Sequence, residues 1–319
     1  MSQDPINLGG TASALSADST KETRNGLFFA LAAYGSWGLF PLYFSLLAEV
    51  PSVEVVANRI VWSLAMMTIW FLLLGRWREV WSALRQPKVF GILALTGFLI
   101  SGNWLTYVWA VGHGRATEAS LGYYIVPLVN VATGYLLLSE RPSRLQLVAI
   151  VIAFLAIALQ IILLGTIPIV SLLLAFTFGS YGYLRKIVPV GANLGLLIEL
   201  IIVAPFALVY VVYLQSSGLG HLSLSDPMIS VLILITGILT AFPLIWFSMA
   251  ARRLRMSTIG IMQYLNPTLQ FLVAVFLLNE TVPAGKLVTF GLIWLSVLIY
   301  SYDAYRSRRR EPRPPALQV

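Results

Sequence analysis

The sequence predicts an all-α polytopic membrane protein, with ten transmembrane helices in two inverted five-helix repeats and both termini in the cytoplasm. Three observations support this prediction. The 319 residues are 58% hydrophobic and only 11% charged, whereas soluble proteins carry about 25% charged residues. Apolar runs of about 20 residues, each long enough to cross a bilayer as a helix, recur along the chain. One stretch of the chain also repeats, and the basic residues gather on one side of the expected spans.

The internal repeat relates residues 96–140 to residues 236–280, which align without a gap at an offset of 140 residues. Self-similarity at a fixed period is a primary sign of a repeated structural unit. Ten of the 45 aligned positions are identical, including an arginine, a tyrosine, a glutamate and the pair Pro127 and Pro267. Each copy consists of two apolar segments joined by a short polar link, so the chain is expected to contain two related halves.

Ten spans are expected after a polar segment at the start of the chain. Residues 1–23, rich in Ser, Thr, Gly and Asp, are expected to form a disordered cytoplasmic tail. They lack the features of a cleaved signal peptide, so the first span is expected to be retained. The spans are expected at residues 24–47, 52–75, 88–111, 117–138, 144–164, 168–187, 192–214, 227–250, 256–278 and 284–303. They divide into a first repeat over 24–164 and a second over 165–303, followed by a basic cytoplasmic tail over 304–319.

The charges of the loops predict the orientation of the spans. With the N-terminus in the cytoplasm, 18 of the 21 basic residues lie near cytoplasmic ends, Arg115 and Lys286 lie outside, and Arg59 lies within a span. A cytoplasmic excess of Lys and Arg is the usual signature of membrane orientation. The bias alternates correctly for an even number of spans, which favours ten helices with both termini inside.

Residues 76–86 are too short and too charged to cross a membrane. Trp77 and Trp81 lie four residues apart, on one face of a helix, with arginines around them. The pattern predicts an amphipathic helix in the inner membrane interface. A charged loop is the alternative.

A second pair of matching segments links the first and sixth spans. Residues 34–38 resemble residues 178–182 at an offset of 144, so spans one to five correspond to spans six to ten. Because five is odd, the second copy must lie upside down in the membrane. Inverted repeats of this kind are common in secondary transporters, whose two halves move about a central site.

These stretches carry a family resemblance. The chain resembles the ten-helix drug/metabolite transporter superfamily with paired EamA-type repeats and, within it, the bacterial RarD proteins. The matching stretches lie between about residues 26 and 300 and are ALAAYGSWGLFPLYF, the pattern Glu54…Arg59…Trp62-Ser63, GNWLTYVWAV, EASLGYYIVPLVN, YGYLRK and RRLRMSTIGIMQYLNPT. The resemblance implies a transporter with a central cavity between the halves, acting as an exporter. It does not supply a substrate.

Pro127 and Pro267 occupy equivalent mid-span positions. Proline removes a backbone donor and clashes with the carbonyl four residues earlier, so each is predicted to kink its helix. A carbonyl freed inside a bilayer needs a partner or a cavity, so the prolines either line a substrate path or serve packing alone. The polar and aromatic residues that flank them are expected in a substrate cavity: Tyr123, Tyr124, Asn130, Gln263, Tyr264 and Asn266.

Further cavity candidates lie in the first, third and sixth spans. Asn103, with Trp104 and Tyr107 beside it, is expected to face the cavity; a hydrogen bond between helices is the alternative. The other candidates for cavity walls, for which a lipid-facing position is the alternative, are Tyr34, Trp37 and Tyr181.

Three ionisable residues lie within apolar spans, where charged side chains are costly and usually functional. Arg59 is expected either to hold an anionic group of the substrate or to bridge helices in a buried ion pair. Glu54 and Glu199 are candidates for proton coupling, because a buried carboxyl group can bind and release a proton; for Glu54, contact with water at the interface is the alternative. The glutamates at helix ends are interpreted as interfacial: Glu118, Glu140 and Glu280.

The residue types present argue against an enzyme. The chain has no cysteine, two histidines, and none of the HExxH, Walker A or GxSxG patterns. No cofactor, metal site or nucleic-acid partner is expected. The expected partners are a small-molecule substrate, the lipid bilayer and, as a candidate coupling ion, the proton. The leading hypothesis is a secondary transporter of the bacterial inner membrane that exports a small organic metabolite or drug. A non-transporting scaffold or regulator and a facilitative channel are the alternatives.

Overall fold

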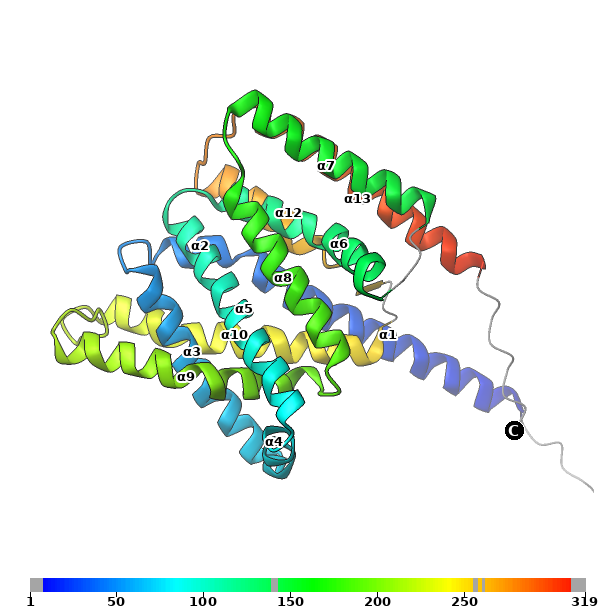
Figure 1. Cartoon of the computed structure of the whole chain (residues 1–319). Coiled ribbons are helices and arrows are strands. Elements are labelled where there is room, and N and C mark those ends of the chain that lie inside the picture. Colours follow the sequence, from blue (N-terminus) through cyan, green and yellow to red (C-terminus); the bar gives the residue numbers. More distant parts are fainter. Residues whose placement is uncertain (1–7, 139–142, 255–257, 260–261, 311–319) are drawn as a thin grey trace, which may run out of the picture.

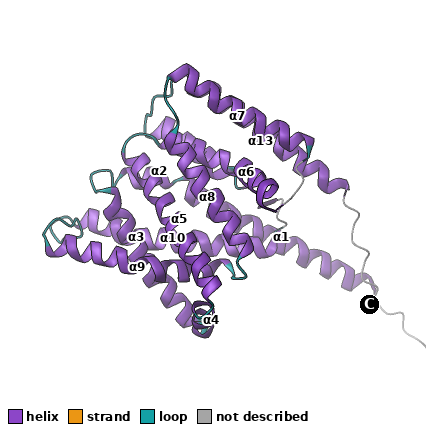
Figure 2. Cartoon of the chain, in the orientation of Figure 1, coloured by secondary structure: helices purple, strands orange, loops and turns teal. Residues whose placement is uncertain are grey.

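The computed structural model describes residues 8–138, 143–254, 258–259 and 262–310. Figure 2 shows helices joined by loops throughout these residues, with no strand among them. The all-α prediction is confirmed for this part of the chain.

In the described residues, eight helical segments are long and apolar enough to cross a membrane. The protein is therefore a polytopic helical membrane protein. The segments are α1 (Leu8–Gly38) continued by α2 (Phe40–Ser45), α3 (Ser52–Leu73), α5 (Pro87–Gly112), α6 (Ala116–Leu138), α7 (Arg144–Leu164), α9 (Ala192–Ser216), α10 (Pro227–Arg253) and α13 (Ala284–Arg310).

Two of the expected spans are at least partly helical but are not among the eight segments that are long and apolar enough to cross a membrane. Residues 168–187 correspond to the 19-residue α8 (Ile169–Ile187). Residues 256–278 correspond in part to the short α12 (Leu265–Leu272) and the π-helical η1 (Val273–Leu277). A single turn of π-helix adds a residue to the helical repeat and is common at functional sites.

The first helix begins earlier than expected. α1 starts at Leu8, so residues 8–23 are helical where a disordered tail was expected. Extending a helix that is already nucleated by an apolar span costs little, even for polar residues. An ion pair at 3.0 Å between Glu22 and Arg253 also ties this segment to the end of α10. At the other end α13 continues to Arg310, and residues 311–319 of the expected basic tail lie outside the described residues.

Several helix ends follow directly from the local sequence. The side-chain oxygen of Ser143 accepts a hydrogen bond from the backbone N–H of Gln146, and the backbone N–H of Ser143 donates to the side-chain oxygen of Gln146. The two bonds form a capping box before α7. Gly165 ends α7 with φ of 63°, a conformation that glycine adopts without strain. Asp226 accepts from the N–H of Ile229 and Pro227 follows it, so α10 begins there.

The segment 76–86 contains the short helix α4 (Trp77–Leu84), so the predicted helix, and not the alternative charged loop, is observed. Val80 and Ala83 are buried against the bundle, whereas Trp81 is 55% exposed. Trp77 packs against the apolar core, so the two tryptophans differ in their surroundings. The helix is confirmed; its position in a membrane interface stays a prediction.

The bundle has an inner group of helices and an outlying pair. α7 and α13 lie side by side along one edge, which is at the top of Figure 1. Inside, α3 packs against α9 and α10, and α5 packs against α8 and α9. The largest apolar core lies among these inner helices and α2, and it contains Phe44, Met67 and Leu197. The charged side chain described next lies in this core.

Candidate functional site

Arg59 of α3 is buried among aromatic rings, with 4% of its surface exposed. Its Nε donates a hydrogen bond to the hydroxyl of Thr240 on α10 at 2.8 Å. The guanidinium carbon lies 4.1 Å from the ring centroid of Trp104, and 5.6 and 5.7 Å from those of Phe44 and Phe40. Electron-rich ring faces attract a cation, and the attraction is larger where water is absent.

The charge of Arg59 has no acidic partner in the described part of the chain. Among those residues no carboxylate lies within ion-pair distance of its guanidinium. The hydroxyl of Thr240 donates its own proton to the carbonyl of Thr236 at 2.9 Å, so it has a lone pair free to accept from Arg59. The described residues therefore do not provide the buried ion pair that was one alternative for Arg59.

Tyr107 of α5 belongs to the same group of aromatic side chains that surrounds Arg59. It is 3% exposed, and its hydroxyl is buried without a hydrogen-bond partner in the described residues. Its ring centroid is 6.0 Å from that of Phe44 and 5.9 Å from that of Tyr123. The predicted candidates Arg59, Trp104, Tyr107 and Tyr123 are thus brought together.

Asn103 of α5 holds three helices together. Its amide donates to the carbonyl of Leu174 at 3.1 Å and to the hydroxyl of Thr177 at 2.9 Å, both on α8. Its oxygen accepts from the hydroxyl of Tyr123 on α6 at 3.0 Å. These contacts match the alternative reading of Asn103, in which its amide joins helices.

A second group of candidates lies where α1 meets α10 and α12. The rings of Tyr34 and Trp37 are 5.6 Å apart, and each contacts Phe247. The hydroxyl of Tyr34 donates to the carbonyl of Ile259 at 3.5 Å, and the amide of Gln270 donates to the carbonyl of Trp37 at 3.2 Å. Tyr34 is buried in protein, so it does not face lipid.

A third group joins α6 to α12. The hydroxyls of Tyr124 and Thr268 are 2.6 Å apart, and the ring of Tyr124 stacks on that of Tyr264 with centroids 6.4 Å apart. Tyr124 also contacts Phe290 and Trp294 of α13. These two tyrosines, which align in the internal sequence repeat, therefore stack on each other and lie in a different cluster from Arg59.

The two predicted helix kinks differ in the structure. Pro127 lies inside the uninterrupted helix α6, whereas Pro267 lies in the first turn of α12, after a break at residues 263–264. The carbonyl of Gln263, which Pro267 cannot pair, accepts instead from the N–H of Asn266 at 3.3 Å. The side-chain oxygen of Asn266 accepts from Gln270 at 2.8 Å. Asn130, the remaining polar candidate of α6, is exposed.

Glu199 of α9 is 1% exposed and well supplied with donors. It accepts from the hydroxyl of Thr96 at 2.7 Å and from the hydroxyl of Tyr181 at 3.3 Å. Nε of Arg185 on α8 lies 3.7 Å from its carboxylate. Hydroxyls and a neighbouring cation are the partners that a buried carboxylate requires.

Glu54 lies at the start of α3 and binds the loop between α9 and α10. Its carboxylate accepts from the backbone N–H of His221 at 2.7 Å and lies 2.7 Å from Nδ1 of the same histidine. Glu54 is 1% exposed, so it is buried rather than in water at the interface. Proton coupling by Glu54 or Glu199 stays a prediction.

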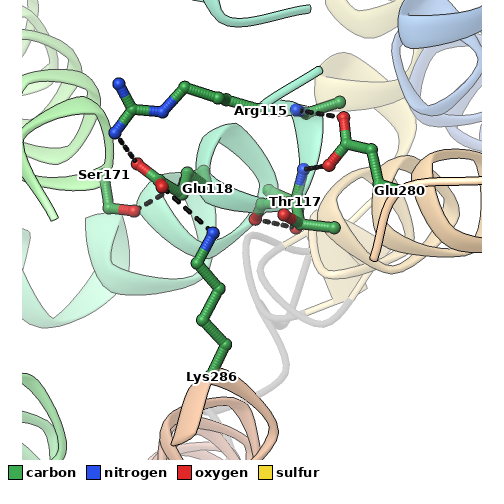
Figure 3. A network of polar contacts seen from close by, with 8 residues as sticks. Arg115, Thr117, Glu118, Ser171, Glu280 and Lys286 are labelled. Atoms are coloured by element: carbon green, nitrogen blue, oxygen red, sulfur yellow. Dashed lines mark hydrogen bonds and ion pairs between the residues drawn. The ribbon is translucent and has the colours of Figure 1, made fainter. Parts of the chain in front are cut away.

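A polar network that the sequence did not indicate links α6, α8 and α13 to the segment after η1 at one end of the bundle (Figure 3). The carboxylate of Glu280 accepts from the backbone N–H groups of Ala116 and Thr117 at 2.6 and 2.9 Å, which caps α6. Glu118 pairs with Arg115 at 2.7 Å and with Lys286 of α13 at 3.0 Å. Ser171 of α8 donates to the carbonyl of Glu118 at 2.7 Å. Glu118 is therefore bound in the network and mostly buried, and its position at a membrane interface stays a prediction.

The partners of the candidate residues were the part that sequence reasoning missed. Several contacts of Arg59 and Glu54 come from residues that were not predicted as site residues. They are Phe40, Phe44 and Thr240 around Arg59, and His221 beside Glu54. Phe40 and Phe44 are four residues apart, a spacing that places them on one helix face. No local signal relates Thr240 to Arg59, because 181 residues separate them. Among the described residues, no group of three or more His, Asp or Glu is arranged to hold a metal.

The fold is that of a polytopic helical membrane protein with charged side chains buried inside the bundle. The model of the EamA-like transporter family matches residues 24–162. Uncharacterized transporter PA0485 of Pseudomonas aeruginosa is 44% identical over 92% of this chain and 99% of that protein. Protein RarD of Escherichia coli is 40% identical over 91% of this chain and 98% of that protein. The chain belongs to the EamA-like transporter family and is a multi-pass bacterial membrane protein.

Two further similarities agree with this assignment. The chloramphenicol-sensitive protein RarD of Pseudomonas aeruginosa is 30% identical over 90% of this chain and 97% of that protein. A solved crystal structure that is 18% identical covers 88% of this chain and 98% of that chain, with a TM-score of 0.59, and so shares the fold. The family and the names of these relatives indicate a transporter rather than an enzyme.

Proposed function

We propose that the protein is a secondary carrier of the bacterial inner membrane that exports a small organic metabolite or drug by alternating access. In this proposal, residues 24–164 and 165–303 form two inverted repeats, and the substrate binds between them. The symmetry of the helix contacts is the observation that carries the proposal.

Each main helix contact has a mate when the two halves are exchanged. The exchange replaces α1 by α8, α3 by α9, α5 by α10, α6 by α12 and α7 by α13. The contact of α1 with α10 then corresponds to that of α8 with α5, and α3 with α10 corresponds to α9 with α5. The contact of α6 with α8 corresponds to that of α12 with α1. The pairs α3 with α9 and α7 with α13 map onto themselves. Such pairing is typical of two repeats related by a two-fold axis.

Glycines at equivalent positions support the same symmetry. A side chain at Gly97 of α5 would meet the backbone of Glu199 on α9, and one at Gly237 of α10 would meet the backbone of Trp62 on α3. Gly97 and Gly237 are related by the offset of 140 residues. The same kind of close approach therefore occurs in both halves, as expected for small residues between transmembrane helices.

The position of Arg59 between the two proposed repeats supports the proposal. Arg59 and its aromatic neighbours come from α2, α3 and α5, while Thr240 comes from α10 in the second half. A ligand at this point contacts both halves, so their relative movement changes its environment. On the predicted topology the network of Glu280, Glu118 and Lys286 closes the outer end of the bundle. In this proposal the network holds the carrier in a state closed to the outside.

Metabolite profiling of growth medium is the first test. Cells expressing the intact protein, Arg59→Ala, Tyr264→Ala or the matched control Tyr302→Ala at equal membrane levels are compared with cells lacking the protein. Tyr302 is 60% exposed on α13, so its replacement is expected to leave transport unchanged. A compound enriched outside with the intact protein and the control, but not with the other variants, supports export through the proposed site.

Flux in proteoliposomes then separates the alternatives. The identified compound should show saturable uptake and counterflow if the protein is a carrier. Flux that rises linearly with concentration favours a channel, and absence of flux favours a scaffold or regulator. A proton gradient applied across the vesicle membrane tests coupling through Glu199, since Glu199→Gln should abolish any dependence on that gradient.

A further inference from the structure

We propose that Arg59 and Tyr107 form the polar end of a binding site for an organic anion, a carboxylate with a flat apolar body. This inference names the substrate class of the proposed carrier, and so it rests on the proposed function. It starts from two buried donor groups: the guanidinium of Arg59, for which the described residues supply one hydrogen-bond acceptor, and the hydroxyl of Tyr107, for which they supply none.

The guanidinium of Arg59 offers five N–H donors in a planar fork. The described residues accept one of them, at Nε, through the hydroxyl of Thr240. The terminal nitrogens therefore present four donors and most of the positive charge. A buried cation without an anion is strongly unfavourable, and ring faces offset this only in part. A bidentate acceptor such as a carboxylate has the geometry that matches this fork.

The hydroxyl of Tyr107 is the second donor. It is buried and has no acceptor among the described residues. A buried hydroxyl without a partner costs free energy, which a ligand oxygen would recover. Tyr107 and Arg59 both contact the ring of Phe44, so the two residues belong to the same aromatic group.

The surroundings define the body of the ligand. The rings of Trp104, Phe40 and Phe44 lie around the guanidinium, and Tyr123 packs against Tyr107. The hydroxyl of Tyr123 is already bound to Asn103, which leaves a mainly apolar wall on that side. Apolar and aromatic walls with a few convergent polar groups are typical of sites for small organic molecules. The polarity of these residues favours a flat monocarboxylate over a sugar or a polyphosphate, whose many polar groups would stay unpaired.

Binding of defined probes to the purified full-length protein tests the proposal. The probes are 1-naphthoate, its neutral isostere 1-naphthamide and the cation 1-naphthylmethylammonium. Thermal unfolding and titration calorimetry measure the binding of each probe. We expect 1-naphthoate to bind and to raise Tm, and the other two probes to bind at least about tenfold more weakly, the scale of one charge-assisted hydrogen bond. Absence of naphthoate binding, or equal binding of the amide, overturns the proposal.

Variants locate the binding. Arg59→Gln is expected to weaken naphthoate at least about tenfold, and Arg59→Lys to weaken it less, because lysine keeps the charge without the fork. Tyr107→Phe is expected to weaken it about tenfold, the effect of one hydrogen bond to a charged group. Since this hydroxyl has no partner in the described protein, the variant should fold normally. Arg78→Gln on α4 and Tyr302→Phe are the matched controls. Unchanged naphthoate affinity in both Arg59→Gln and Tyr107→Phe overturns the assignment.

The outcomes distinguish this site from the carrier proposal. Naphthoate binding that depends on Arg59, without flux of any bound carboxylate in proteoliposomes, supports the anion site and contradicts the carrier. Flux of a neutral compound that is unaffected by Arg59→Gln supports the carrier and contradicts the anion site.

Discussion

Glu280 is expected to hold the outer end of the bundle closed, and its removal should open that end. Both oxygens of its carboxylate accept backbone N–H groups at the start of α6, at 2.6 and 2.9 Å. These donors have no partner within the helix, and the positive end of the helix dipole favours a negative charge there. Glu280 belongs to the segment after η1, so the contact joins the two proposed repeats.

The structure allows a rough magnitude for Glu280→Ala. A hydrogen bond to a charged group contributes about 1.5–3 kcal/mol, and the helix dipole adds about 0.3–1 kcal/mol. The two bonds share one carboxylate and do not add fully, so we take about 2–4 kcal/mol for the closed state. If water pairs these groups in the open state, the balance between closed and open states shifts by about 30- to 1000-fold. Glu280→Gln keeps one acceptor oxygen, so its closed–open equilibrium should lie between those of the intact protein and Glu280→Ala.

Cysteine accessibility provides the assay, because the chain has no native cysteine. Ser120 of α6 is fully buried one turn inside the capped end, so Ser120→Cys reports opening. A membrane-impermeant maleimide added from outside should label this variant slowly, and about 30-fold faster or more when Glu280→Ala is present. Glu79→Ala, which removes an exposed carboxylate of α4, is the matched control.

A second reporter separates opening from unfolding. Ser296 of α13 is buried and donates to the carbonyl of Ala149, away from the network. Ser296→Cys should stay unreactive when Glu280 is removed. Equal labelling of Ser120→Cys with and without Glu280 would refute the reasoning. So would faster labelling of both reporters together, since that indicates a general loss of packing.

Three further predictions address topology, packing and the second buried charge. His113→Cys should react with an impermeant maleimide added outside intact cells, whereas Arg85→Cys should react only after the membrane is opened, as the distribution of basic residues predicts. Gly237→Ala should lower stability by about 1–3 kcal/mol, because the new methyl group would lie 2.6 Å from a backbone carbon of α3. Gly91→Ala, which meets open space, should not lower it. Thr96→Val should lower stability by about 1–3 kcal/mol, because it removes a donor from the buried carboxylate of α9. Thermal unfolding in detergent measures the stability of Gly237→Ala, Gly91→Ala and Thr96→Val.

Each of these predictions has an outcome that contradicts it. Labelling of both cysteines from the same side of the membrane excludes the proposed orientation. A Tm for Gly237→Ala equal to that of Gly91→Ala shows that α3 and α10 can separate without cost. A Thr96→Val variant as stable as the intact protein means that the other donors to the carboxylate suffice.

The spans were predictable because their signals are local. α3 begins at Ser52 and α9 at Ala192, as the ends of the apolar runs predict. The break before Pro267 was not predictable in the same way. Pro127 occupies the equivalent position of the repeat, yet α6 continues through it. A proline removes the same donor in both places, so the difference depends on which neighbours satisfy the freed carbonyl, and sequence periodicity does not contain that information.

The residue types of the candidate site were also predictable, whereas their grouping was not. Charged and amide side chains in apolar spans indicate burial and function. Their partners depend on how each helix is rotated about its axis and on which helix lies beside it. Glu54 and His221 are 167 residues apart, and Asn103 is 71 residues from the carbonyl that it binds. These contacts depend on the packing of the bundle, so no pattern in a single span indicates them.

Arg59 and Glu199 illustrate how the two proposed repeats would produce one asymmetric site. They are separated by 140 residues, the offset of the internal repeat, and each binds a threonine hydroxyl on a neighbouring helix of the other half. In the second half Arg185 also lies beside the carboxylate of Glu199, so that charge is balanced within the protein. In the first half the described residues supply no corresponding anion to Arg59. An anionic substrate would therefore provide for Arg59 what Arg185 provides for Glu199. On the proposed assignment, this difference in partners makes Arg59 a binding group and Glu199 a structural one.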